Sequence, residues 1–378
     1  MTPFHGFSLR LLALALLLLL QCASQAELPQ FRTGPTSPAE TTSRLLAECS
    51  EEDLAQIGPL LRTHHLQRDS ITDPGSNRDA VAALLTQLAP GVRLLPATAA
   101  QTEDATPFHM DAVDGKIGYL RLGSLTADHV ADLDTALQGM TEKGISAIVL
   151  DLRATAPSSQ WELAADICRR FIPKGKLLFR VQTSDPKDDR LFSAREEPRF
   201  RGPLTVLVHA LDAGAPEIIA GVLRIQAKAI VIGDTTSGLA VQFSDMPLPS
   251  GKLLRIPTAR VELSDKSTLF PNGLKPDLTA RMSPETTASA LQAATEKGIL
   301  QVLAEPERPR LNEAALVAGS DPERDWAQSR SLREKNAPST QDTALQRAID
   351  LCISLGVYTP SPKPPKNSAA KSAENRAR

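Results

Sequence analysis

The stretch P-L-T-V-L-V-H-A-L-D-A-G-A-P-E-I-I-A-G-V-L, residues 203–223, decides the fold of this chain. Its first part is a continuous apolar run, which predicts a buried strand over 203–209, and its second part predicts an amphipathic helix over 216–226. Gly214 lies in the short turn between them. A second segment, V-I-G-D-T-T-S-G-L-A-V-Q, follows at residues 231–242 and opens with another apolar strand pattern. Strands that alternate with helices in this way are typical of α/β proteins.

These two segments resemble the active-site segments of the C-terminal processing (tail-specific) serine peptidases. In that family the first reads S-A-S-A-x-E-I, whose middle serine is the nucleophile, and the second reads G-E-x-T-F-G-K-G-x-V-Q, whose lysine is the general base. On this resemblance the nucleophile position is Gly214 and the base position is Leu239. The second segment is one residue short here, so Gly238 is the alternative base position.

Neither position carries a group that can do the chemistry of a serine peptidase. Acyl transfer needs a nucleophile that is activated by a base within hydrogen-bond reach. Gly214 has no side chain to attack with, and Leu239 has no atom that accepts a proton. Gln242 matches a glutamine that assists the family's base, but no lysine precedes it.

A third segment departs from the family in the same direction. The family's strand ends L-D-L-R-N-N-P-G-G, and its glycine backbone helps to form the oxyanion hole. Residues 150–153 match as L-D-L-R, but the chain continues as A-T-A-P-S over 154–158. Proline has no N–H, and a residue other than glycine resists positive φ. We therefore interpret the chain as a pseudoenzyme.

The resemblance covers residues 116–278 and implies a crotonase-like ββα spiral core with N- and C-terminal helical segments. It begins at the strand pattern 117–122 and ends with G-L-K-P-D at 273–277, which resembles the family's closing signature. Most members insert a PDZ module before this core, but only residues 96–115 are available here, too few for an independent domain.

The apolar patterns predict the following elements. Helices are expected between 37 and 90, at 126–142, 159–171, 216–226 and 284–297, and from Asp342 onward; strands are expected at 117–122, 146–152, 176–182, 203–209 and 228–233, with two more across 240–263. Charged residues at 185–199 indicate a surface loop. The domain organisation that follows is a signal peptide (1–26), an N-terminal helical segment (27–96), a linker (97–115), the peptidase-like core (116–282), a C-terminal helical segment (283–359) and a disordered basic tail (360–378).

Composition excludes several classes of function. The net charge of −2 argues against nucleic acid as a partner, and 4% aromatic residues offer few stacking platforms. The six histidines are scattered, so we expect neither a metal site nor a cofactor. After removal of the signal peptide three cysteines remain, and the sequence leaves open whether Cys49 and Cys352 form a disulfide.

We expect the chain to bind a peptide or a protein without cutting it. The retained residues Ala215, Glu217, Thr236 and Gly238 are candidate binding residues, although a structural role explains them equally simply. The helix that opens at Ala215 has N–H groups and a positive dipole end, which favour a carboxylate.

Two alternatives stay open. In the first, a relocated serine peptidase site uses Ser237 with His209 and Asp212, which flank the old nucleophile turn. In the second, the chain is a non-catalytic subunit of a homo- or hetero-oligomer, because family members associate through terminal helices.

The N-terminus has the pattern of an export signal. Arg10 precedes an apolar run over 11–20, and S-Q-A at 24–26 is a small-x-small cleavage motif. The run is too short to span a membrane. Cys22 would allow a lipid anchor, but Gln21 stands where a small residue is required. The pattern favours an exported protein of the periplasm or cell envelope.

We predict that the mature chain begins at Glu27, because cleavage after Ala26 fits the motif best. N-terminal sequencing of the protein from its native compartment checks this. An intact Met1 would contradict the export signal, and a lipid-modified Cys22 would contradict the cleavage site.

Overall fold

The structure is a computed structural model that describes residues 38–97, 106–303 and 341–358. Its centre is a six-stranded sheet of order β11-β8-β7-β4-β3-β2. The strands are β2 (His109–Val113), β3 (Ile117–Arg121), β4 (Ala147–Asp151), β7 (Leu204–Val208), β8 (Ile230–Gly233) and β11 (Leu278–Thr279). β2 is antiparallel to β3, and the other neighbours are parallel. The expected α/β fold class is therefore confirmed.

Both faces of this sheet are covered, which explains its continuous apolar strands. Every residue of β3, β4 and β7 is buried. Successive side chains of a strand point to opposite faces. Leu150 accordingly packs into the cluster of α5 (Ala127–Glu142), α6 (Trp161–Arg169) and α7 (Ala215–Gln226), whereas Val149 packs against the C-terminal segment. Parallel sheets are stable only when both faces are buried in this way.

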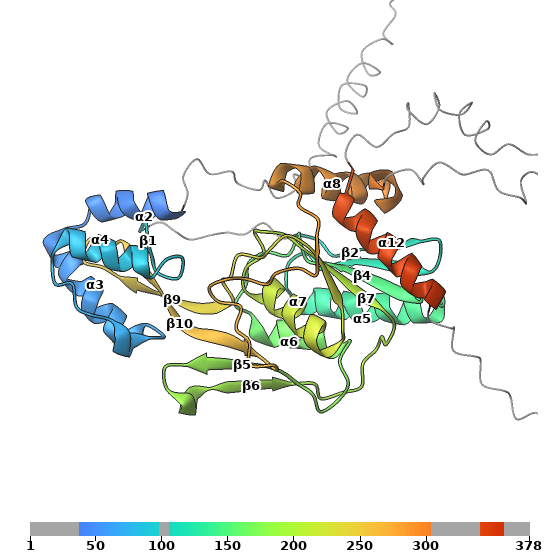
Figure 1. The fold of residues 1–378 in the computed structure, drawn as a ribbon, viewed down its shortest axis with the longest axis horizontal. Coiled ribbons are helices and arrows are strands. Elements are labelled where there is room, and N and C mark those ends of the chain that lie inside the picture. Colours follow the sequence, from blue (N-terminus) through green and yellow to red (C-terminus); the bar gives the residue numbers. More distant parts are fainter. Residues whose placement is uncertain (1–37, 98–105, 304–340, 359–378) are drawn as a thin grey trace, which may run out of the picture. The chain divides into compact units, whose positions relative to one another are not determined.

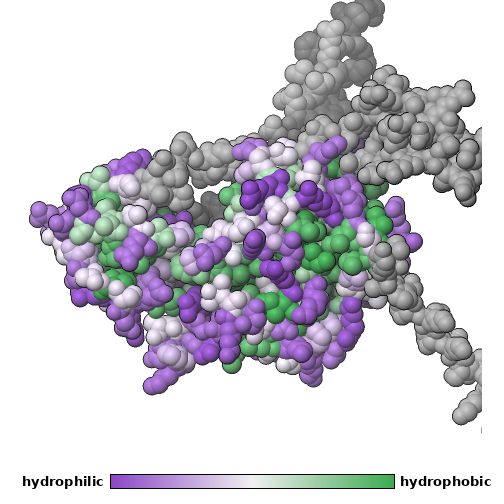
Figure 2. Space-filling model, viewed as in Figure 1, coloured by the Kyte–Doolittle hydropathy of each residue, from purple (hydrophilic) through white to green (hydrophobic). Residues whose placement is uncertain are grey.

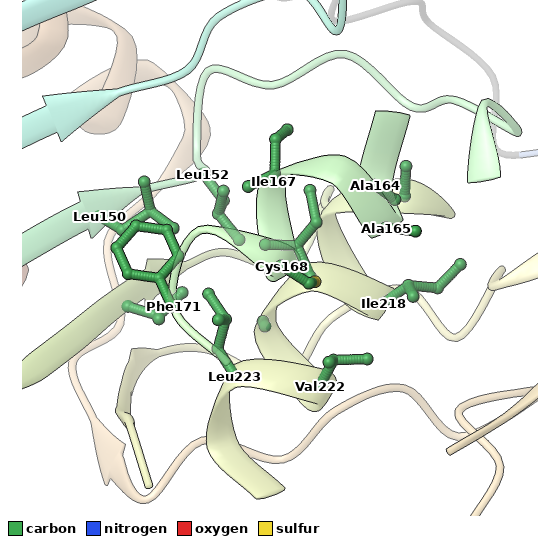
Figure 3. Packing of buried hydrophobic residues seen from close by; sticks show 14 of the residues in the cluster. Leu150, Leu152, Ala164, Ala165, Ile167, Cys168, Phe171, Ile218, Val222 and Leu223 are labelled. Atoms are coloured by element: carbon green, nitrogen blue, oxygen red, sulfur yellow. The ribbon is translucent and has the colours of Figure 1, made fainter. Parts of the chain in front are cut away.

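Helices α6 and α7 pack against each other over β4. Cys168 of α6 faces α7, which contributes Ile218 and Val222 to the same buried cluster, and Leu150 of β4 lies beside Phe171 (Figure 3). α7 begins directly after the turn at Gly214, so this packing fixes where that turn lies.

A second sheet is antiparallel throughout. It contains β1 (Arg93–Leu95), β5 (Leu177–Thr183), β6 (Arg190–Ser193), β9 (Val241–Pro247) and β10 (Leu253–Leu263), and β10 pairs with β1, β5 and β9 (Figure 1). β6 lies in the segment that the sequence predicted as a surface loop, so that prediction was wrong in part. The strand is short, and only Phe192 is buried. Because charged residues surround it, the sequence shows no alternation of apolar and polar residues there.

The N-terminal helices pack against the first half of β10 and the end of β9 that pairs with it. They are α2 (Pro38–Ala47), α3 (Glu51–His64) and α4 (Arg78–Gln87), with the short 3₁₀ turn η1 (Arg68–Ser70). Leu54 and Ile57 of α3 share a core with Leu254 and Ile256 of β10. β1 and β2, which lie in the segments expected to be helical and to be a linker, are both strands.

The C-terminal segment consists of α8 (Pro284–Lys297), the 3₁₀ turn η3 (Ile299–Val302) and α12 (Thr343–Tyr358). A buried ionic cluster holds this segment against the sheet. Arg153 Nη2 lies 2.7 Å from both Asp151 Oδ2 and Asp342 Oδ2, and all three side chains are almost fully buried. Tyr119 Oη donates to Asp151 at 2.8 Å. Because breaking a buried pair leaves an uncompensated charge, this cluster ties α12 firmly to the end of β4.

The cysteines at 49, 168 and 352 are all free and buried. Cys49 Sγ donates to Leu45 O, whereas Cys352 Sγ lies 3.3 Å from Thr205 Oγ1 in a different core cluster. The structure thus answers the open question of a Cys49–Cys352 disulfide in the negative.

Hydrophilic residues cover much of the face shown in Figure 2, with smaller apolar areas between them. Within the described ranges, no helix has the length and apolar content needed to cross a membrane. The segments predicted to be a signal peptide (1–26) and a basic tail (360–378) lie outside the described residues.

Candidate functional site

The turn at Gly214 joins the end of β7 to α7, as the sequence predicts. Gly214 is the N-cap of α7 and has φ 72° and ψ −119°. This conformation is one that glycine adopts without the steric cost of a Cβ atom. A Cβ atom built at Gly214 would lie 2.4 Å from Ser158 O. The turn therefore accommodates glycine, and a larger residue would have to displace the neighbouring backbone.

The carboxylate of Glu217 organises the site. It is fully buried and accepts four hydrogen bonds. Oε2 accepts from Gly214 N at 2.9 Å and from Leu239 N at 2.8 Å. Oε1 accepts from Thr236 Oγ1 and Gly238 N, both at 2.6 Å. One side chain thus joins the start of α7 to the segment 236–239.

This arrangement brings the two family positions together, because the N–H groups of Gly214 and Leu239 point to the same oxygen atom. Gly238, the alternative base position, leaves no room for a side chain. Gly238 has φ +73°, and a Cβ atom there would lie 2.1 Å from Pro271 O. Leu239, the predicted base position, is half-buried.

Thr236 carries the network one step further. Its hydroxyl donates to Glu217 and accepts from Leu274 N at 2.8 Å. Leu274 belongs to the G-L-K-P-D segment, so the closing signature and the two site segments form one hydrogen-bonded unit. Gln242 lies on β9 opposite Ala259 and is half-buried.

Residues 154–158, which replace the family's glycine segment, lie against the start of α7. Ser158 forms an isolated parallel bridge with Gly214. Ala215 N donates to Ser158 O at 2.8 Å, Gly214 N is used by Glu217, and Pro216 has no N–H. The sequence suggested that the N–H of Ala215 faces a ligand, but the Ser158 carbonyl occupies it instead. No side-chain pattern predicts a contact of this kind, because it is made by backbone atoms.

His209, Asp212 and Ser237, the residues of the relocated-site alternative, lie close together, but the histidine and the serine contact different atoms of Asp212. His209 Nδ1 lies 2.5 Å from Asp212 Oδ1, and His209 N donates to Asp212 Oδ2 at 3.0 Å. Ser237 Oγ donates to the backbone oxygen of Asp212 at 2.8 Å. A nucleophilic serine must give its proton to a base, and here that proton is directed to a carbonyl.

Burial dominates the electrostatics of both acidic groups in this region. It raises the pKa of Asp212, which the neighbouring His209 partly opposes. It also raises the pKa of Glu217, against the opposing effect of the Thr236 hydroxyl and the three backbone N–H groups. All four partners of Glu217 are donors, so the carboxylate form fits the geometry.

Across the described part of the chain, no group of three or more His, Cys, Asp or Glu side chains is arranged to hold a metal ion.

Comparison with known proteins agrees with this geometry. Residues 116–280 match the family model described as Peptidase family S41. The core of this chain is therefore similar to peptidase family S41. The match spans β3 to β11 and so contains every site segment described above.

Curated relatives match over the same part of the chain. The carboxyl-terminal-processing protease of Synechocystis sp. is 28% identical over 183 residues, which is 48% of this chain and 41% of that protein. The carboxy-terminal processing protease CtpA of Bacillus subtilis is 27% identical over 169 residues, 45% of this chain and 36% of that protein. The chain thus spans well under half the length of these relatives.

Among solved structures, a photosystem II D1 C-terminal processing protease superposes with a TM-score of 0.44 at 22% sequence identity. The superposition covers 56% of this chain and 55% of that chain.

We predict that Gly214→Ser is inert towards a serine-directed fluorophosphonate probe and less stable than the wild type. The new Cβ meets Ser158 O in a backbone conformation that L-residues rarely adopt, and no base is present to activate the hydroxyl. Adding Leu239→Lys should give at most feeble labelling, since one missing oxyanion-hole donor alone costs about 10²–10³ in rate.

The measurement is the rate of covalent labelling. The matched control is Gly139→Ser in α5, where a new Cβ atom would meet no neighbouring atom within 4 Å. Rapid labelling of Gly214→Ser alone, above that of the control, would show that another base is already in place.

Proposed function

We propose that this chain is an exported, catalytically inactive member of peptidase family S41 that acts by binding peptides or proteins. The observation that carries the proposal is the pair of residues held by Glu217. Gly214 and Leu239 donate to one carboxylate oxygen at 2.9 and 2.8 Å, in the places where the family resemblance requires a nucleophile and a base. Removal of one member of such a unit abolishes nearly all of its covalent rate enhancement.

The surroundings of the turn are suited to contact with a peptide. Leu211 is 48% exposed between the end of β7 and Gly214, and Leu239 is half-buried. Apolar side chains at the surface beside a turn can pack against a side chain of a ligand. Ala215, Glu217, Thr236 and Gly238 are buried, so in this proposal they hold the two segments in place and do not touch the ligand.

A carboxylate that approaches the start of α7 has to compete with Ser158. The carbonyl of Ser158 already accepts from Ala215 N. We therefore expect a ligand to contact Leu211 and Leu239 beside the turn, and not the N-terminus of α7.

A relocated serine peptidase site is the alternative proposal, and the His209–Asp212 pair supports it. Nδ1 and Oδ1 lie 2.5 Å apart, and a histidine oriented by a buried carboxylate is the usual form of a general base. The Ser237 hydroxyl would have to leave the Asp212 carbonyl before it could use that base. Assembly as a non-catalytic subunit with an active relative is compatible with either proposal.

We expect the chain to bind unfolded polypeptides in a saturable manner and to leave them intact. The test incubates the full chain with fluorescently labelled unfolded peptides, measures binding by anisotropy and analyses the peptides by mass spectrometry. Intact peptides together with saturable binding support the proposal.

Turnover that Ser237→Ala abolishes would contradict the inactive assignment and establish the relocated site. Ser244→Ala, a half-buried serine on β9, is the matched control for that substitution. Failure to bind any peptide would contradict the binding role.

A further inference from the structure

Two arginines lie side by side on one face of the second sheet, where β1 pairs with the first part of β10 (Figure 1). Leu94 of β1 and Leu254 of β10 belong to the core that is shared with the N-terminal helices. Successive side chains of a strand point to opposite faces. Arg93 and Arg255, the next residues on the two strands, therefore point away from those helices, and they are direct partners in the register.

The aromatic ring of Phe243 on β9 is in contact with both guanidinium groups. The Cζ atoms of Arg93 and Arg255 each lie 5.7 Å from the centre of this ring. A cation within about 6 Å of an aromatic face is attracted to it. Two like charges opposite each other on adjacent strands repel, so the ring offsets part of this repulsion.

Asp245 of β9 neutralises only one of the two arginines. Its carboxylate accepts from Nε and Nη2 of Arg255, both at 2.7 Å, in a bidentate pair. Within residues 38–97, 106–303 and 341–358, Arg93 forms no ion pair, and its Nε is buried without an acceptor. We call Arg93, Phe243, Asp245 and Arg255 the cationic patch.

The charge balance of the cationic patch is set by its own members. Burial, and then the charge of Arg255, lower the pKa of Arg93. Hydrogen bonding raises the pKa of Arg255 and lowers the pKa of Asp245. No further ionisable group in the described part of the chain contributes to these three shifts. Two arginines and one aspartate thus leave one positive charge uncompensated.

A ligand in solution has access to the cationic patch. The side chains of Arg255 and Asp245 are 22% and 33% exposed. Arg93 and Phe243 are half-buried, so the ring and the uncompensated guanidinium group are fixed in place and still reach the surface.

The cationic patch also lies close to the candidate functional site, and residues 270–271 connect the two. A Cβ atom built at Gly91, two residues before Arg93, would lie 2.8 Å from Cζ of Phe270. One built at Gly238 would lie 2.1 Å from Pro271 O. The loop at Gly238 and the start of β1 therefore contact neighbouring residues of one segment.

We propose that the cationic patch binds an acidic side chain of a peptide, with Arg93 as its ionic partner. A guanidinium group that is held in place and lacks a carboxylate partner is suited to accept one in a bidentate manner. Phe243 follows Leu239 by four residues, a span of at most about 14 Å. One extended peptide can therefore place an apolar side chain at Leu239 and an acidic one at Arg93.

This inference rests on the proposed peptide-binding function and specifies a residue type that favours binding. It differs from recognition of a chain end, because the acidic group is a side chain within the peptide.

The test compares three forms of one unstructured peptide that has fluorescein at its N-terminus and an amide at its C-terminus. The peptide contains one leucine and, four residues away, glutamate, glutamine or lysine; the other positions are glycine and serine. Both orders of the leucine and the variable residue are synthesised, since an extended peptide can run in either direction along β9. Affinities for the full chain are measured by anisotropy at low ionic strength.

We expect the glutamate form to bind at least about threefold more tightly than the glutamine form in one of the two orders, because a half-exposed ion pair is a modest interaction. The lysine form should bind more weakly than the glutamine form. Salt at about 1 M, where the Debye length is about 3 Å, should remove most of the difference.

Arg93→Met should abolish the difference between the glutamate and glutamine forms, and Arg93→Lys should retain part of it. Asp245→Asn removes the carboxylate of the cationic patch and should increase the difference, which a purely structural role of Arg93 does not predict. Arg201→Met, an exposed arginine whose partner is Glu197, is the matched control and should leave the difference unchanged. Thermal unfolding of each variant verifies that the fold is intact.

Equal affinity of the glutamate and glutamine forms for the wild type in both orders would overturn this inference alone, as would a difference that persists in a folded Arg93→Met variant. Should Arg93→Met fail to fold, a difference that does not increase in Asp245→Asn would overturn it. Failure of every peptide form to bind would overturn the proposed peptide-binding function together with it.

Discussion

The Glu217 carboxylate is the interaction on which the site depends. It is buried at the first turn of α7 and reaches segments that are about 20 residues further along the chain. A buried charge is tolerated only when its hydrogen-bonding capacity is satisfied, and four donors meet that condition here. Without these donors, the turn at Gly214 and the loop at Gly238 would have no common anchor.

The position of this anchor follows from the sheet. β4, β7 and β8 are parallel neighbours, so the loops that follow them emerge at the same edge. Those loops contain Ser158, Gly214 and Leu239, respectively. Open α/β sheets place their functional sites at the carboxyl ends of the strands for this reason. The contacts that hold the turn at Gly214 and the segment 236–239 together are thus also contacts that hold the fold.

Much of this arrangement could be predicted from the sequence, because its main elements carry strong local signals. The apolar run ending at Val208 and the amphipathic helix after Gly214 have a single reasonable interpretation. The short strands were harder. β6 has one buried side chain, Phe192, among charged neighbours, and β1 has one, Leu94, so neither presents a periodic pattern.

The contacts within the site were the least predictable part. The sequence identified Glu217 as retained but gave no reason for its retention, since its partners are mostly backbone N–H groups brought in by folding. The Ser158 carbonyl and the left-handed conformation of Gly238 are likewise backbone properties. His209 and Asp212 were named as neighbours from their spacing, but the sequence left their hydrogen bonds undetermined.

The central claim is that Glu217 holds this framework together for structural reasons. The most direct test is the free energy of unfolding of Glu217→Gln, with the exposed Glu196→Gln as the matched control. The amide turns an NH₂ group towards backbone donors, and each unsatisfied buried donor costs about 1–3 kcal/mol. Because the pKa of Glu217 is raised, the charge itself opposes folding at neutral pH, and its removal offsets part of this cost. We predict a net loss of about 1–3 kcal/mol in Glu217→Gln and a change within about 0.5 kcal/mol in the control. A Glu217→Gln variant as stable as the wild type would contradict the account.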